Sequence, residues 1–244
     1  EPRQSPEGIA ALLNDPAATT ARLTTPAVTG QVIQYSAAAL RGDHLLLVAT
    51  DPGREVEIVL RNNRLASYAD PLRWELSDQQ MKRLDAGAIA VGESGAVRFT
   101  AAAGGLYLLG ASAGANTFSL VSSNVPVALL AVEGVHLLGH TERLYFAVPA
   151  GLQQFKLRVR GGSGETVRLN VYDPAGEMVA TCQTSLNKDQ AEVQVSVGAQ
   201  GGRMWALELA RADEGTLEDH LLYLDPALPP ALSLHPAHVF GATP

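Results

Sequence analysis

The sequence predicts an all-β protein: two tandem antiparallel β-sandwich domains of jelly-roll type, with a short N-terminal helix and one inserted helix. Three observations predict this class. Several segments alternate apolar and polar residues with a period of two, as a strand with one buried face requires. Turn residues recur roughly every 8–12 residues. Amphipathic helical segments of about 10–15 residues do not separate the strands, which favours a sandwich over βαβ units.

The N-terminal segment, residues 1–22, is predicted to hold the short helix. Ser5 is a suitable N-cap, Pro6 suits the first helical position, and the Asp15-Pro16 pair marks the end. From about Arg22 the sequence changes to strand-like pieces separated by turns.

The first predicted domain covers residues 23–124. In the segment 55–60, Val56, Ile58 and Leu60 face one way and both glutamates face the other. The segment Ser77-Asp78-Gln79-Gln80 has the pattern of a capping box, with Gly87 beyond its end. This pattern predicts the inserted helix over Asp78–Ala86.

The second predicted domain covers residues 125–244, with the boundary near Ser122–Pro126, where turn residues join two strand-like runs. Its strands alternate most regularly; they are predicted over 154–160, 167–172, 193–197 and 203–209. A chain of 244 residues is long enough for two domains that each bury a core.

Composition excludes several classes of function. The net charge of −7 argues against a nucleic-acid binder, which needs a basic surface against phosphate. No run reaches the roughly 18 apolar residues that a membrane span needs, so no membrane association is predicted. One cysteine excludes a disulfide framework and a multi-cysteine metal site. The first residues lack the layout of a signal peptide, as expected of a mature chain or of a piece of a longer protein.

The run Gly110-Ala111-Ser112-Ala113-Gly114 matches the G-x-S-x-G nucleophile elbow of serine hydrolases. Acids and histidines lie downstream, in the order that an α/β-hydrolase shows. Three features oppose this interpretation: residues 116–121 alternate like a strand and not a helix, no His-Gly-Gly run precedes the motif, and the chain has few helices to cover a sheet. A small-residue hairpin turn between two strands is the favoured interpretation, and an esterase-like hydrolase that uses Ser112 is the alternative.

Other reactive residues give no strong pattern, and no catalytic residue, metal site or cofactor is predicted. His235 and His238 are three residues apart without a third ligand at a suitable spacing. The acids in 213–219 offer oxygen ligands for calcium but lack the calcium-loop motif. Cys182 alternates with apolar neighbours and is predicted to be a buried thiol. Trp74 and Trp205 share their faces with leucines and are predicted to be core residues.

One predicted surface has a composition suited to ligand binding. By alternation, the outward residues of three strands in the second domain are basic or bear hydroxyl and amide groups. If these strands are neighbours in a sheet, they form a basic face with exposed tyrosines, suited to a neutral or acidic glycan. The alternative is an ordinary solvated face. The candidate ligand-binding residues are Arg143, Tyr145, Lys156, Arg158, Arg168, Asn170 and Tyr172, with Arg160 beside them.

The second half resembles the bacterial pre-peptidase C-terminal type of β-sandwich and the jelly-roll accessory domains of secreted glycoside hydrolases. The resemblance covers roughly residues 135–240 and rests on 144–149 (LYFAVP), 155–160, 171–176 (VYDPAG) and 205–209. It implies a non-catalytic accessory region of a secreted, periplasmic or cell-surface bacterial protein. The implied partner is a polysaccharide or an adjoining catalytic domain. A purely structural or protein-interaction module is a further alternative.

Overall fold

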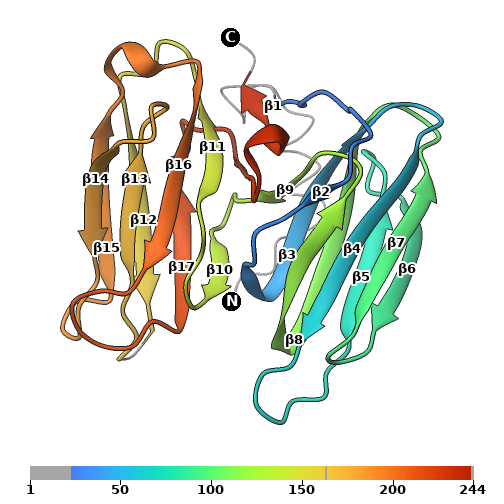
Figure 1. Ribbon diagram of the computed structural model, residues 1–244, viewed down its shortest axis with the longest axis horizontal. Coiled ribbons are helices and arrows are strands. Elements are labelled where there is room, and N and C mark those ends of the chain that lie inside the picture. Colours follow the sequence, from blue (N-terminus) through green and yellow to red (C-terminus); the bar gives the residue numbers. More distant parts are fainter. Residues whose placement is uncertain (1–22, 163, 243–244) are drawn as a thin grey trace.

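The computed structural model describes residues 23–162 and 164–242 and confirms the all-β class. Within these residues the regular structure consists of strands and two short 3₁₀-helices, η1 (Gly198–Gln200) and η2 (Pro236–His238). Figure 1 shows two lobes side by side: an N-terminal lobe, coloured blue to green, and a C-terminal lobe, coloured yellow to red. The predicted N-terminal helix lies outside the described residues.

The N-terminal lobe is built around one long strand, β8 (Gly105–Ser123). Strand β3 (Ala39–Thr50) pairs along one side of β8. On the other side, the first part of β8 pairs with β5 (Leu72–Ser77) and the second part with β4 (Glu55–Asn63). The lobe is completed by β2 (Ile33–Gln34), β6 (Arg83–Ile89) and β7 (Ser94–Thr100). Gly95 of β7 lies against the Ile89 side chain of β6, so the β4–β7 and β5–β6 pairs pack face to face.

The G-x-S-x-G run forms the bend at which β8 passes from one layer to the other. Asp43 pairs with Ser112 and Arg41 with Thr117, so residues 113–116 stand opposite Gly42 alone. Gly42 and Gly114 have φ of 77° and 61°, a region that glycine enters without strain. The predicted hairpin turn is therefore wrong, because the chain continues through the bend as one strand. Small residues are used here because the backbone changes direction in a crowded place.

The C-terminal lobe is an eight-stranded sandwich with jelly-roll connectivity. One four-stranded sheet has the order β11-β16-β13-β14, and facing it the order is β15-β12-β17-β10. The strands are β10 (Val135–Leu138), β11 (Leu144–Val148), β12 (Gln154–Gly161), β13 (Arg168–Tyr172), β14 (Met178–Gln183), β15 (Gln190–Ser196), β16 (Arg203–Ala210) and β17 (Asp219–Leu224). The predicted alternation holds: every second residue of β12 is buried, and Trp205, Leu207 and Leu209 of β16 are core residues.

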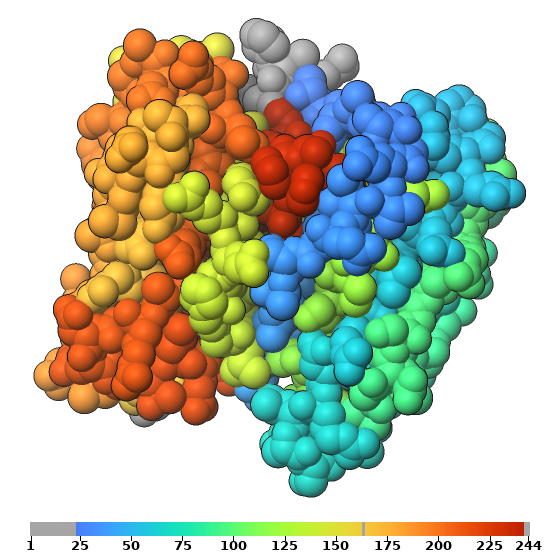
Figure 2. Space-filling model, in the orientation of Figure 1, coloured from blue at the N-terminus to red at the C-terminus, as the bar shows by residue number. Residues whose placement is uncertain are grey.

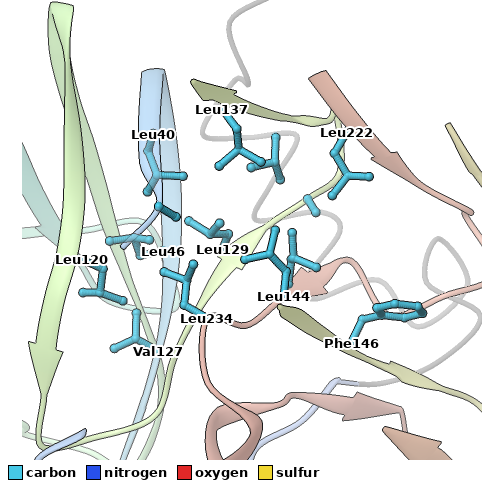
Figure 3. Close-up of a cluster of buried hydrophobic side chains, with 14 of the residues drawn as sticks. Leu40, Leu46, Leu120, Val127, Leu129, Leu137, Leu144, Phe146, Leu222 and Leu234 are labelled. Carbon is cyan, nitrogen blue, oxygen red and sulfur yellow. The ribbon is translucent and has the colours of Figure 1, made fainter. Parts of the chain in front are cut away.

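The two lobes share a sheet and a core. Strand β10 pairs with β17 of its own lobe and with β3 of the N-terminal lobe, so one 13-stranded sheet crosses the junction. Figure 3 shows buried side chains from both lobes in one cluster, among them Leu46, Leu129 and Leu222. The predicted boundary at 124/125 falls just before β9 (Val127–Leu130), which pairs back onto β3.

The C-terminal segment packs between the lobes. Strand β18 (Ala231–Leu232) pairs with β9, and β19 (Gly241–Ala242) pairs with β1 (Leu23–Thr24). In Figure 2 this red segment lies against the blue one that begins the described chain. The Tyr35 hydroxyl and His238 Nδ1 are 2.6 Å apart, which joins the two segments by a side-chain hydrogen bond.

The helix predicted over Asp78–Ala86 is wrong. The chain instead makes a tight turn after β5 and returns as β6, with Trp74 opposite Gly87. The Asp78 carboxylate accepts hydrogen bonds from the backbone N–H groups of Gln80 and Lys82, so the expected helix cap closes a turn. Pairing of β6 with β5 supplies tertiary contacts that outweigh the local helix signal.

Candidate functional site

The candidate ligand-binding residues lie on two different sheets. Tyr145 is on β11, and Arg168, Asn170 and Tyr172 are on β13, in the four-stranded sheet, with Arg143 directly before β11. The three cations at positions 156, 158 and 160 are on β12, in the facing sheet. Outward residues of two packed sheets point away from each other, so the single face that the sequence suggested is divided into two.

On the outer face of the four-stranded sheet, the tyrosine has protein partners. The Arg143 guanidinium carbon lies 4.2 Å from the Tyr172 ring centroid, and the Tyr172 hydroxyl donates a 2.6 Å hydrogen bond to Glu208. This bond raises the pKa of Tyr172, because Glu208 favours the protonated phenol. One face of the ring is therefore covered. A sugar would have to displace Arg143 to stack there.

The cations of the predicted surface also have partners. Lys156 Nζ is 2.9 Å from Glu192 Oε1, and Arg158 stacks over Tyr223 at 4.3 Å. The Arg168 guanidinium forms an ion pair with Asp213 and donates to Gln183 Oε1. Neither outer face thus presents the concentrated positive charge that the sequence suggested.

A groove with a volume of about 1130 Å³ lies at the junction of the lobes. Its floor comes from β3, β8, β5 and β6 of the N-terminal lobe, and its wall from the β9–β10 turn, β10, β12 and β17. Both lobes are needed to form it. The groove also contains two sequence candidates: Ser112 of the G-x-S-x-G run, and Arg160 of β12.

Polar and small side chains alternate along the groove floor. Asp43, Ser112 and Arg73 stand side by side in one cross-strand row, on β3, β8 and β5. In a neighbouring row, Leu45 and Glu75 flank Gly110, and Ala86 follows Glu75 on β6. The floor therefore combines a carboxylate, a hydroxyl and a guanidinium with room for a ligand to approach the sheet closely.

Two aromatic side chains line the groove, each supported by a glycine. Trp74 of β5 lies on Gly87, where an added Cβ would be 2.6 Å from indole Cζ2. Tyr223 of β17 lies beside Gly134, where an added Cβ would be 2.8 Å from ring Cε1. Trp74, predicted as core, packs against the core on the strand face of Leu72 and Leu76; it is partly buried and is also among the residues that line the groove.

A charged cluster joins the strands beneath the groove. Arg41 of β3 and His136 of β10 both contact the Asp219 carboxylate of β17, with His136 Nε2 at 3.1 Å from Oδ1. Two buried histidines flank the cluster, His44 and His220. Burial lowers the pKa of each to about 4, so both are neutral at neutral pH.

The residues considered for catalysis or metal binding do not form a recognised site. Ser112 lies inside a strand and not at a strand-to-helix elbow, and no hydrogen bond joins it to a histidine in the part of the chain that is described. Burial raises the pKa of the half-buried Cys182 thiol to about 11. Across 23–162 and 164–242, no group of three or more His, Cys, Asp or Glu side chains is placed to hold a metal ion.

Sequence reasoning missed most of the groove. Arg41, Arg73, Glu133 and Tyr223 come from four segments that are far apart in the chain. Pairing of β3 and β5 with β8 brings the first two together, and pairing of β10 with β3 places the other two beside them. No local pattern in the sequence indicates that pairing, so none could have identified the groove.

The fold and the groove define a class: an all-β protein of two joined β-sandwich lobes with an open groove between them. No protein-family model matches the chain, and no curated protein matches it. Among solved structures, the crystal structure of PBSX exported protein XepA is a distant neighbour. It has 13% sequence identity and a TM-score of 0.28, covering 84% of this chain and 88% of XepA. No helix in the described part of the chain is long and apolar enough to cross a membrane.

Proposed function

We propose that this chain is a non-catalytic accessory region of a secreted bacterial protein and that it binds a polysaccharide in the groove between its lobes. The observation that carries the proposal is the lining of the groove: Asp43, Ser112 and Arg73 form a polar row on its floor, and Tyr223 lies on its wall. Aromatic rings offer apolar faces to sugar rings, while the polar groups hydrogen-bond to hydroxyls. An open groove accommodates a chain that continues in both directions.

The groove suits this function better than the outer face of the four-stranded sheet. On that face, Arg143 covers one face of the Tyr172 ring, and Glu208 accepts a hydrogen bond from its hydroxyl. Arg158 likewise covers one face of Tyr223, so the difference between the two surfaces lies in their polar groups. In the groove, Arg73 and Asp43 have no ion-pair partner within the described residues. Their hydrogen-bonding groups are therefore available to a ligand.

Affinity-gel electrophoresis against a panel of neutral and acidic polysaccharides tests the proposal. We expect retardation by at least one polysaccharide, a loss of retardation in Arg73→Ala and Tyr223→Ala, and normal retardation in Tyr145→Ala and Tyr172→Ala. Circular dichroism and urea unfolding show that each variant is folded. Loss of retardation only in the Tyr145 and Tyr172 variants would move the site to the outer face. No retardation by any polysaccharide would end the proposal.

One observation favours a second candidate, a hydrolase. Ser112 and His136 both line the groove, and His136 contacts the Asp219 carboxylate, as the base of a nucleophile–base–acid arrangement would. Turnover of p-nitrophenyl esters that disappears in both Ser112→Ala and His136→Gln would support this candidate. Turnover that persists in the Ser112→Ala variant would exclude Ser112 as the nucleophile.

A further inference from the structure

The charged residues of the groove nearly cancel one another. Four arginines line it, and three of them have carboxylate partners: Arg41 with Asp219, Arg83 with Glu75 at 3.5 Å, and Arg160 with Asp189 at 3.7 Å. Among the described residues, this pairing leaves one guanidinium, on Arg73, and two carboxylates, on Asp43 and Glu133. The groove is thus not a cationic site, although it contains four arginines.

The order of side chains on the floor has a chemical consequence. Asp43 only accepts hydrogen bonds, the Ser112 hydroxyl both donates and accepts, and Arg73 only donates. Adjacent strands are about 4.8 Å apart, so the backbones at Asp43 and Arg73 are separated by about 10 Å, well within the roughly 30 Å Debye length of a low-salt buffer. An anionic group attracted by Arg73 is therefore repelled by Asp43. A hydroxyl, which donates and accepts, satisfies both ends of the row.

We infer, on the basis of the proposed function, that the groove takes a neutral, hydroxyl-rich polysaccharide and discriminates against an acidic one. Arg73 donates hydrogen bonds to hydroxyl groups of the polysaccharide, and Asp43 accepts hydrogen bonds from them. Gly110, two residues before Ser112 on β8, has no side chain, so the chain can approach the sheet beside this row. Glu133, at the turn before β10 on the opposite wall, adds a second repulsive charge for any carboxylate or sulfate.

The test compares a neutral glucan with polygalacturonate at two ionic strengths. We expect the protein to bind the neutral glucan, with an affinity that changes less than about twofold over a tenfold range of salt. We expect polygalacturonate to bind at least about tenfold more weakly, with binding improved in Asp43→Asn, because this change removes a repulsive charge and keeps a hydrogen-bonding group. The matched control is Asp213→Asn, whose carboxylate pairs with Arg168 in the four-stranded sheet; neither residue is part of the groove lining.

The outcomes separate this inference from the proposed function. Preferential binding of polygalacturonate, weakened by salt, would overturn the inference and leave polysaccharide binding intact. Equal affinity for both polymers, unchanged in Asp43→Asn, would also overturn it. If neither polymer binds and the wider panel is also negative, the proposed function fails together with the inference.

Discussion

The indole of Trp74 lies directly on Gly87, one strand away in the hairpin of β5 and β6. A Cβ at Gly87 would be 2.6 Å from Cζ2 and 2.8 Å from Cε2 of the ring, closer than van der Waals contact allows. The ring is rigid and packs against the core, so it has little room to move. The absence of a side chain at Gly87 therefore sets the position of an aromatic residue of the groove.

The first prediction follows from this contact. Gly87→Ala should displace the Trp74 ring and lower the free energy of unfolding by about 1–3 kcal/mol, as overpacking of a well-packed site does. It should also shift the tryptophan fluorescence and weaken polysaccharide binding. Urea unfolding followed by fluorescence measures the first two effects. The control is Gly53→Ala, where nothing lies within 4 Å of an added Cβ although φ is 73°; fluorescence of this variant should match the parent.

The second prediction concerns pH. His44 is 7% exposed and His220 is 2% exposed, and burial lowers the pKa of both from 6.5 to about 4. The unfolded chain binds these protons more readily, so stability from the neutral histidines is present above about pH 6.5 and is lost as the pH falls toward 4. Each buried histidine accounts for about 3 kcal/mol of this change.

Urea unfolding at a series of pH values measures how the free energy of unfolding depends on pH. Two variants assign this dependence to the two histidines. His44→Gln keeps a donor for the Arg41 carbonyl, and His220→Asn keeps one for the Glu218 carbonyl. Each variant should lose part of the pH dependence between 6.5 and 4. His140→Gln, at an exposed position, should not. An unchanged slope in both buried-site variants would show that other groups cause the acid sensitivity.

The third prediction concerns the bend in β8. Gly114 has φ of 61°, and an added Cβ would be 2.9 Å from Cβ and Cγ of Asp70, whose carboxylate accepts from the Ala115 N–H group. Gly114→Ala should therefore be destabilising by about 1–3 kcal/mol, through both φ strain and the clash. Gly92→Ala is the matched control, because its φ is 83° with nothing within 4 Å of an added Cβ. A smaller loss in Gly114→Ala than in Gly92→Ala would contradict this account of the bend.

How far the sequence predicts this fold depends on where the determining contacts lie. The alternation of β12 and of Trp205, Leu207 and Leu209 is local, and it correctly predicts strands and buried faces. At Asp78 the same side chain can cap a helix or close a turn, and the pairing of β6 with β5 decides between them. The predicted binding face depended on which strands are neighbours, which alternation cannot reveal. The groove depends on β10 pairing with β3, a contact between residues about 100 positions apart.

The last prediction concerns the cluster that joins the lobes. Asp219 contacts Arg41 of β3 and His136 of β10, and the three side chains are only about a quarter exposed. Asp219→Asn removes the charge that holds Arg41 and should lower the free energy of unfolding by about 1–2 kcal/mol, a range reduced for partial solvent screening. Asp189→Asn, at an exposed pair with Arg160, should change stability by less than about 0.5 kcal/mol.

The strands in which hydrogen exchange increases distinguish a role of Asp219 at the junction of the lobes from a general loss of stability. Because β10 links the lobes through β3, weakening the cluster should increase hydrogen exchange of the β3 and β10 amides before that of β13 and β16, in the far sheet. Polysaccharide binding should weaken in parallel, since both lobes form the groove. Hydrogen exchange with mass spectrometry measures the pattern. Uniform protection loss in all four strands would show that Asp219 supports the whole fold and not the junction.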